Sequence, residues 1–242
     1  MPLTLPREPV PATEGSPKIL IVYGLPKIGK TPLVAMLPNL LLLDIDKPHG
    51  SDYVTCMKMK LDNALQIPEV ARLVATANYP YKYLALDTLD SLEDWAESEG
   101  TRLYKASIIG KNFNGDSILE LPKGAGYQIL RNVYRKLLSP LLTLAPYIIL
   151  IGHVRDKDLD TGGAATVSVK ALDLTGKLRT IVCGMACAIG HMYRDKTGTP
   201  IIDINTTEET ACGVRCKHLI GKQIRFSNPY KVEDWKQIYT DL

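Results

Sequence analysis

The sequence predicts an α/β fold with a mainly parallel central sheet flanked by helices. Two observations support this prediction. Short runs of apolar and β-branched residues recur at 18–23, 40–45, 83–87 and 147–152, and strands so uniformly apolar are typical of sheets covered on both faces. Segments that suit helices lie between these runs, as expected for alternating strands and helices.

The helices expected between these strands span residues 30–37, 64–77, 91–99 and 126–144. Towards the C-terminus, residues 186–193 and 200–205 predict a hairpin around the turn 195–199. We therefore expect antiparallel strands to extend one edge of the sheet.

The chain divides by composition into an arm, a core and a tail. Residues 1–17 form a proline-rich arm that can build neither a helix nor a central strand, and residues 18–225 form the core. The arm is either disordered or docked on a neighbouring subunit. Residues 226–242 are assigned to a C-terminal tail segment.

Two connections, 105–124 and 156–175, exceed the usual connection length of about 4–6 residues. Long loops near the carboxyl ends of parallel strands are suspected of function. The alternative is that both are flexible surface insertions.

The amino-acid composition limits the possible class of protein but does not identify a binding partner. The 242 residues carry a formal net charge of +3, which neither requires nor excludes contact with nucleic acid. The five cysteines and the absence of a secretory pattern make a disulfide framework unexpected, so we expect a reducing, cytoplasmic location. No window holds 18 uninterrupted apolar residues, so no membrane span is expected.

A glycine-containing segment directly follows the first expected strand. It reads Gly-Leu-Pro-Lys-Ile-Gly-Lys-Thr from Gly24 to Thr31, and a turn of this kind between a strand and a helix directs backbone N–H groups at phosphate. We expect Lys30 to reach the β- and γ-phosphates of ATP and the Thr31 hydroxyl to bind Mg²⁺. The predicted nucleotide contacts are Gly24, Leu25, Pro26, Lys27, Ile28, Gly29, Lys30, Thr31 and Pro32.

A phosphate site of this kind needs a carboxylate at the end of a neighbouring strand to support the metal. Asp87 ends the strand 83–87 and is the predicted magnesium ligand. A helix-capping role is the alternative, but Asp90 fits that role better.

Two further carboxylates, Asp44 and Asp46, end the strand 40–45. Strand alternation places both on one face, where one could polarise water while the other supports magnesium or a loop. The alternative is that both are turn residues before Pro48 and Gly50.

His153 follows the apolar strand 147–152. If that strand lies beside the strand of Asp87, the imidazole lies near the γ-phosphate and could sense nucleotide state. The alternative is a structural histidine.

In this order, the motifs resemble the RecA-like ATPase core. The similarity extends in particular to short phage-encoded AAA-family or nucleotide-binding proteins that promote single-strand annealing, and it covers residues 17–225. The resemblance implies that Asp46 takes the place of the catalytic glutamate, one methylene shorter. It also implies that His153 takes the sensor position.

The same resemblance implies partners. Such proteins form rings or filaments that bind nucleotide between subunits, with a basic residue from the neighbour completing the site; Arg215 and Lys217 are the candidates, projecting together if they lie on a strand. The resemblance also implies binding of single-stranded DNA through the two long loops, with a single-strand DNA-binding protein as a further candidate partner. The candidate DNA contacts are Lys105, Lys111, Phe113, Lys157 and Lys170.

Two other functions stay open: a P-loop kinase acting on a small molecule, and a nucleotide-controlled binding module with negligible turnover. A kinase would need an arginine-rich lid, and residues 156–175 contain few arginines.

A cluster of possible zinc ligands is also present but lacks the common finger spacings, and we favour buried thiols. Its members are Cys183, Cys187, His191, Cys212, Cys216 and His218.

Overall fold

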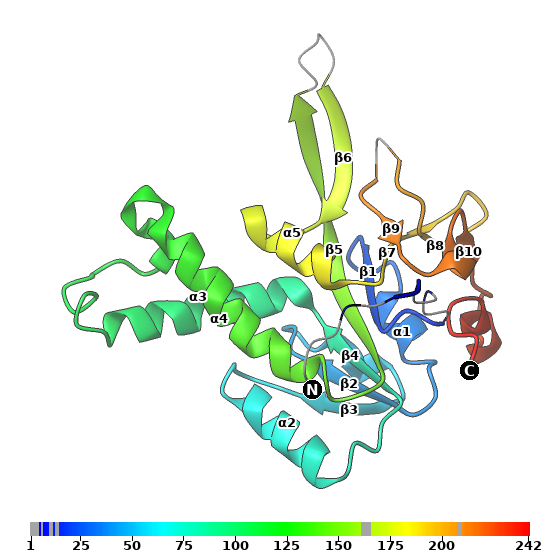
Figure 1. The fold of residues 1–242 in the computed structure, drawn as a ribbon, viewed down its shortest axis with the longest axis horizontal. Helices are drawn as coiled ribbons and strands as arrows, with labels where there is room; N and C mark the ends of the chain where they lie inside the picture. The colour runs from blue at the N-terminus through cyan, green and yellow to red at the C-terminus, as the bar shows by residue number, and fades with distance from the viewer. Residues whose placement is uncertain (1–4, 6, 10–11, 13–14, 161–165, 208–209) are drawn as a thin grey trace.

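A central β-sheet organises the chain in the computed structural model, which describes residues 5, 7–9, 12, 15–160, 166–207 and 210–242. The strands follow the order β10-β8-β7-β1-β5-β4-β2-β3 across the sheet (Figure 1). The parallel part consists of β1 (Ile19–Gly24), β2 (Leu40–Asp44), β3 (Met57–Lys60), β4 (Tyr83–Asp87), β5 (Tyr147–Asp160) and β7 (Ala188–Arg194). The antiparallel strands are β6 (Thr166–Leu172), β8 (Pro200–Asp203), β9 (Gly213–Val214) and β10 (Gln223–Arg225).

Helices and the C-terminal segment cover the two faces of the sheet. Side chains alternate along β1, so that Ile21 and Tyr23 join one buried apolar cluster while Leu20 and Val22 join the other. The first cluster packs against α2 (Gln66–Thr76), α3 (Leu89–Lys105), α4 (Ala125–Leu141) and α5 (Gly176–Met185). The second packs against α1 (Lys30–Val34) and the C-terminal segment. The predicted α/β class with an antiparallel extension is therefore confirmed.

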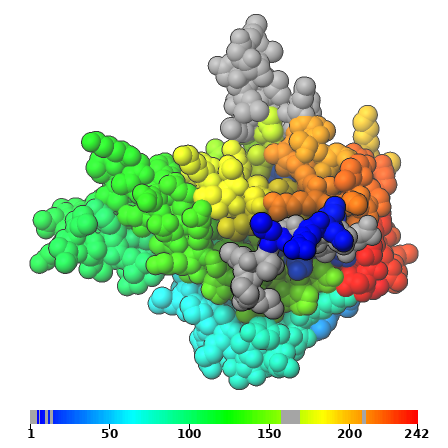
Figure 2. Space-filling view, in the orientation of Figure 1, coloured from blue at the N-terminus to red at the C-terminus, as the bar shows by residue number. Residues whose placement is uncertain are grey.

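The helix ends differ from the sequence prediction. The first helix stops at Val34, three residues before the predicted end, and the chain continues in a tighter turn in which the Leu37 N–H donates to the Val34 carbonyl at 3.0 Å. The helix expected at 91–99 is longer at both ends. Its N-cap is Thr88, whose hydroxyl accepts a hydrogen bond from the Ser91 N–H. Figure 2 shows the projection of α3 and α4, in green, standing out from the rest of the surface.

The connection 156–175 was predicted to be a long loop, and this prediction is wrong. β5 continues to Asp160 and pairs with the antiparallel β6, so most of the segment is a β-hairpin that projects from the sheet (Figure 1). Alternating apolar residues in 166–172 were the missed signal. Residues 161–165 of this connection lie outside the described part of the chain. The short strand β3 and the helix α5 were also not predicted.

The connection 105–124 is an irregular loop for most of its length. It starts at the last residue of α3 and ends in two short 3₁₀ turns, Ile118–Glu120 and Pro122–Gly124, before α4. Ser117 caps the first turn by accepting the Leu119 N–H.

The residues assigned to the N-terminal arm and the C-terminal tail meet at the base of the sheet. The Ser16 hydroxyl donates to the Asp241 carboxylate at 3.1 Å. Trp235, Ile238 and Tyr239 are fully buried in the second apolar cluster, so the tail packs on the core. Within the described residues, no helix is both long enough and apolar enough to cross a bilayer.

Candidate nucleotide site

The segment between β1 and α1 forms the floor of a cavity of about 540 Å³. The Lys30 side chain is buried, and its ammonium donates to the carbonyl oxygens of Gly24 and Leu25, each at 2.9 Å. Burial lowers the pKa of Lys30, and the nearby carboxylate of Asp87 acts in the opposite direction. Of the nine predicted nucleotide contacts, those that line the cavity are Pro26, Lys27, Gly29, Lys30, Thr31 and Pro32.

Thr31 and Asp87 meet at the inner end of this cavity. The Thr31 hydroxyl donates to Asp87 Oδ2 at 2.6 Å. Burial raises the pKa of Asp87 to about 6, although the hydrogen bond from Thr31 lowers it. A half-buried hydroxyl and a buried carboxylate that bond to each other are oxygen ligands of the kind Mg²⁺ prefers, so the donor set fits this ion.

Only Asp44 belongs to β2, so strand alternation does not relate it to Asp46, and the reason given for placing both on one face is wrong. The strand ends at Asp44, which is fully buried and accepts hydrogen bonds from the N–H groups of Asp46 at 3.2 Å and Ser51 at 2.9 Å. Asp46 lies beyond the strand, where alternation no longer applies. It lines the cavity and accepts the Ser91 hydroxyl at 3.0 Å. Asp44 therefore shapes the loop, and Asp46 is the carboxylate available to the cavity.

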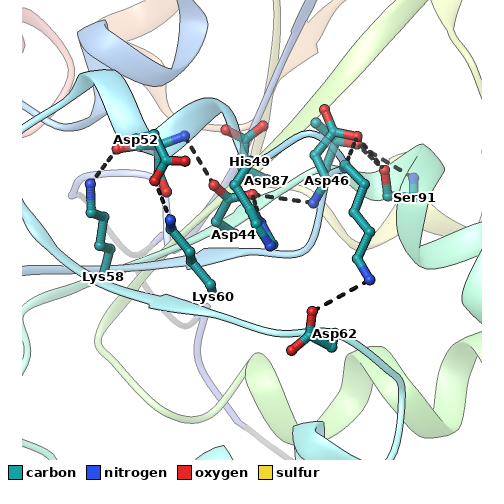
Figure 3. A network of polar contacts seen from close by, with 12 residues as sticks. Asp44, Asp46, His49, Asp52, Lys58, Lys60, Asp62, Asp87 and Ser91 are labelled. Carbon is teal, nitrogen blue, oxygen red and sulfur yellow. Dashed lines mark hydrogen bonds and ion pairs between the residues drawn. The ribbon is translucent and has the colours of Figure 1, made fainter.

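A lip of polar residues that the sequence analysis did not single out closes one side of the cavity. It comprises His49, Asp52 and Tyr53, and the tyrosine is 94% exposed. The unpredicted strand β3 holds this lip, because Lys58 donates to the Ser51 and Val54 carbonyls and Lys60 pairs with Asp52 (Figure 3). The alternating Met-Lys-Met-Lys of residues 57–60 was the available signal.

His153 lies where the sequence analysis placed it. β5 pairs with β4, so the strand of His153 is beside that of Asp87, and the imidazole lines the same cavity. Its Nδ1 lies 2.6 Å from Asp90 Oδ2, and its backbone N–H donates to Asp90 Oδ1 at 3.2 Å. The hydrogen bond with Asp90 raises the pKa of His153 against the effect of burial.

The residues predicted to contact DNA lie on two projections. Lys105 and Lys111 are exposed near the end of α3, whereas Phe113 is half-buried and packs edge-on against Tyr104 with ring centroids 5.5 Å apart. The ammonium of Lys105 lies over the Phe113 ring, 6.0 Å from its centroid, so one ring face is already in contact with a neighbouring side chain. Lys170 is exposed on β6, and Lys157 faces Val169 across the hairpin, although its side chain lies outside the described set.

Arg215 and Lys217 do not share a strand, which corrects that expectation. β9 ends at Val214, and Lys217 begins a 3₁₀ turn. The Arg215 guanidinium donates to the Gly184 carbonyl at 2.8 Å, beside the start of β7. The phosphate loop follows the opposite end of the sheet, so Arg215 cannot reach the nucleotide site of the same chain.

The cysteine and histidine residues scatter over several elements. All five thiols are free and half-buried. Cys212 lies 3.6 Å from the buried Tyr23 hydroxyl, and burial lowers the pKa of His191 to about 4. In the part of the chain that the structure describes, no three His, Cys, Asp or Glu residues are grouped to hold a metal ion.

A glycine-containing loop after β1, a buried lysine at the start of α1 and a hydroxyl–carboxylate pair across to β4 define a P-loop nucleotide-binding protein. Residues 16–216 match the family model described as AAA domain, and the chain belongs to this family of P-loop ATPases. Such domains generally use ATP and Mg²⁺. No curated protein matches the chain closely enough to refine the assignment.

Proposed function

We propose that the protein hydrolyses ATP, and the observation that carries this proposal is the grouping of Lys30, Thr31, Asp87 and Asp46 around one cavity. Lys30 binds the β- and γ-phosphates, and Thr31 and Asp87 hold Mg²⁺. The bound ion supplies positive charge beside the phosphate oxygens. A cation bound beside Asp87 would favour its ionised form and so act against the burial that raises its pKa.

Asp46 is the proposed base for the attacking water. It lines the cavity, and the Ser91 hydroxyl fixes one of its oxygens. His153, which stands on β5 and is held by Asp90, contacts the γ-phosphate and reports its presence. The exposed ring of Tyr53 on the lip offers a flat face on which the adenine base stacks.

We propose further that the protein binds single-stranded DNA as an oligomer and promotes annealing or strand exchange. The hairpin arm formed by β5 and β6 supports this, because it continues from the strand that carries His153 and presents Lys170. Lys105 and Lys111 supply phosphate contacts on the second projection. Arg215 and Lys217 are proposed to act on the nucleotide of a neighbouring subunit. A single-strand DNA-binding protein is a further proposed partner.

The test is the ATP hydrolysis rate of the purified protein with and without single-stranded DNA at low salt, where phosphate contacts are strongest. DNA should stimulate hydrolysis. Lys30→Ala should abolish ATP binding, whereas Asp46→Asn should keep ATP binding and lose turnover by at least about a hundredfold. Unchanged turnover in Asp46→Asn would place the base elsewhere.

Two outcomes lead to other functions. ATP binding without any DNA binding, together with phosphate transfer to a small molecule, would favour the kinase. ATP binding with DNA binding and no hydrolysis in a single-turnover experiment would favour a nucleotide-controlled binding module.

A further inference from the structure

Two side chains distant in sequence pack directly on the phosphate loop. Gly29 has a φ of 108°, and an added Cβ atom at this position would lie 2.3 Å from the Tyr230 hydroxyl and 3.2 Å from Arg194 Nη2. Among the described residues, those lining the cavity include Gly29 but neither Arg194 nor Tyr230. The pair therefore contacts the loop on a flank that does not face the nucleotide cavity.

Arg194 reaches the loop from the end of β7, which pairs with β1 along the strand that leads into the loop. Its guanidinium donates three hydrogen bonds in different directions. Nε donates to the Ile28 carbonyl at 3.2 Å, Nη1 to the Gly198 carbonyl at 2.8 Å and Nη2 to the Tyr230 hydroxyl at 3.0 Å. The planar fork of arginine therefore links the phosphate loop, the turn between β7 and β8, and the C-terminal segment.

The hydrogen bond to Ile28 controls the direction of a neighbouring N–H group. In a trans peptide the C=O of one residue and the N–H of the next lie in one plane and point in opposite directions. Because the Ile28 carbonyl is turned towards Arg194, the N–H of Gly29 is turned away from it. Gly29 itself lines the cavity, so this N–H is directed to the side where a phosphate would lie.

We propose that Arg194, held in place by Tyr230, is a positioning residue that orients the peptide between Ile28 and Gly29 for phosphate binding. This inference rests on the proposed ATP binding at the loop. The C-terminal segment thereby belongs to the nucleotide site, and a second contact agrees with this: Trp235 Nε1 donates to the carbonyl of Leu33 in α1 at 3.1 Å.

The experiment compares Arg194→Met with Arg225→Met. Arg225 is a matched control because it also binds the turn between β7 and β8, through Asp195 Oδ2 at 2.9 Å, and it has no contact with the loop in the described residues. Titration with ATP should show about tenfold weaker binding for Arg194→Met, because this variant loses one charge-assisted hydrogen bond to the phosphate loop. Arg225→Met should weaken ATP binding by less than about twofold. Arg194→Met also loses the hydrogen bonds to Ile28 and Tyr230, so its nucleotide-free melting temperature should fall further than that of Arg225→Met, and ATP binding is measured well below both melting temperatures.

Tyr230→Phe supplies a second, independent readout. It removes only the hydroxyl that holds Arg194 and should weaken ATP binding about threefold, whereas the double variant with Arg194→Met should bind no worse than Arg194→Met alone. Equal ATP affinities for Arg194→Met and Arg225→Met would overturn the inference, and so would additive losses in the double variant. Lys30→Ala distinguishes a failure of the proposed ATP site from a failure of the inference about Arg194. If this variant binds ATP as tightly as the unaltered protein, the phosphate-loop assignment is wrong, and the positioning role of Arg194 is then wrong as well.

Discussion

Asp87→Asn should stabilise the nucleotide-free protein while removing its response to Mg²⁺. The carboxylate is 4% exposed, and burial raises its pKa to about 6 from the ordinary value of 3.8. In the unfolded chain the group ionises near pH 4, so between pH 4 and pH 6 the folded state holds the extra proton. Stability must therefore fall as pH rises through this window.

The magnitude follows from the two pKa values. They differ by about two units, and each unit corresponds to about 1.4 kcal/mol, so the ionised carboxylate costs about 3 kcal/mol at pH 7. Asparagine has nearly the same shape, carries no charge and keeps an oxygen that can accept the Thr31 hydroxyl. For a domain of this size, 3 kcal/mol corresponds to a rise in melting temperature of about 6–12 °C.

The assay is thermal unfolding from pH 4 to pH 8 in EDTA, repeated with ATP and Mg²⁺. The difference between the unaltered protein and Asp87→Asn isolates one carboxylate, and it should grow from pH 4 to pH 6 and then level off. Only the unaltered protein should gain further stability from Mg²⁺ in the presence of ATP. Asp90→Asn is the control: hydrogen bonds with His153 lower the pKa of Asp90 in spite of burial, so this variant should be destabilised at pH 7. An Asp87→Asn variant that melts below the unaltered protein at pH 7 would refute the reasoning.

Three other predictions concern the surroundings of the site. Asp90→Asn should lower the pKa of His153, which is measured by NMR titration of the imidazole. The stability that the His153–Asp90 pair contributes is fully present below the ordinary histidine pKa, and it is lost as pH rises through the raised pKa of His153. Trp235→Phe should lower the free energy of unfolding by about 1–3 kcal/mol in urea titrations, because it leaves a small cavity and removes the hydrogen bond from the indole to the Leu33 carbonyl. Lys170→Ala should reduce the salt dependence of single-stranded DNA binding by about 0.7 in the log–log slope and leave ATP affinity unchanged, and an unaltered slope would exclude a phosphate contact.

The parts of the fold that the sequence predicted are those governed by local pattern. The apolar runs that became β1, β2, β4 and β5 needed only burial on both faces. The hairpin of β5 and β6 was missed because its strands pair with each other beyond the edge of the core. Their side chains are not uniformly apolar, so they lack the signal of a central strand.

The residues of the site also differ in whether local sequence pattern could predict their positions. Lys30, Thr31, Asp87 and His153 follow directly from the ends of predicted strands and the loop after β1. The placement of Asp46 could not be derived, because β2 stops at Asp44 and the loop beyond it is shaped by hydrogen bonds to Asp44. Contacts between segments far apart in the chain, such as that of Arg194 with Ile28, leave no periodic trace in the sequence.

The arrangement around β5 gives a physical route by which a nucleotide could affect the arm. His153 lines the cavity, and its carbonyl accepts the Asp173 N–H at 2.9 Å, just after β6 ends. Two residues further on, the Thr175 N–H donates to the buried carboxylate of Glu93 on α3, the helix that also carries Asp90. Both strands of the hairpin are thus held at their base by the elements that hold His153. A γ-phosphate that shifts the backbone of His153 would therefore move the base of the arm or break one of these hydrogen bonds.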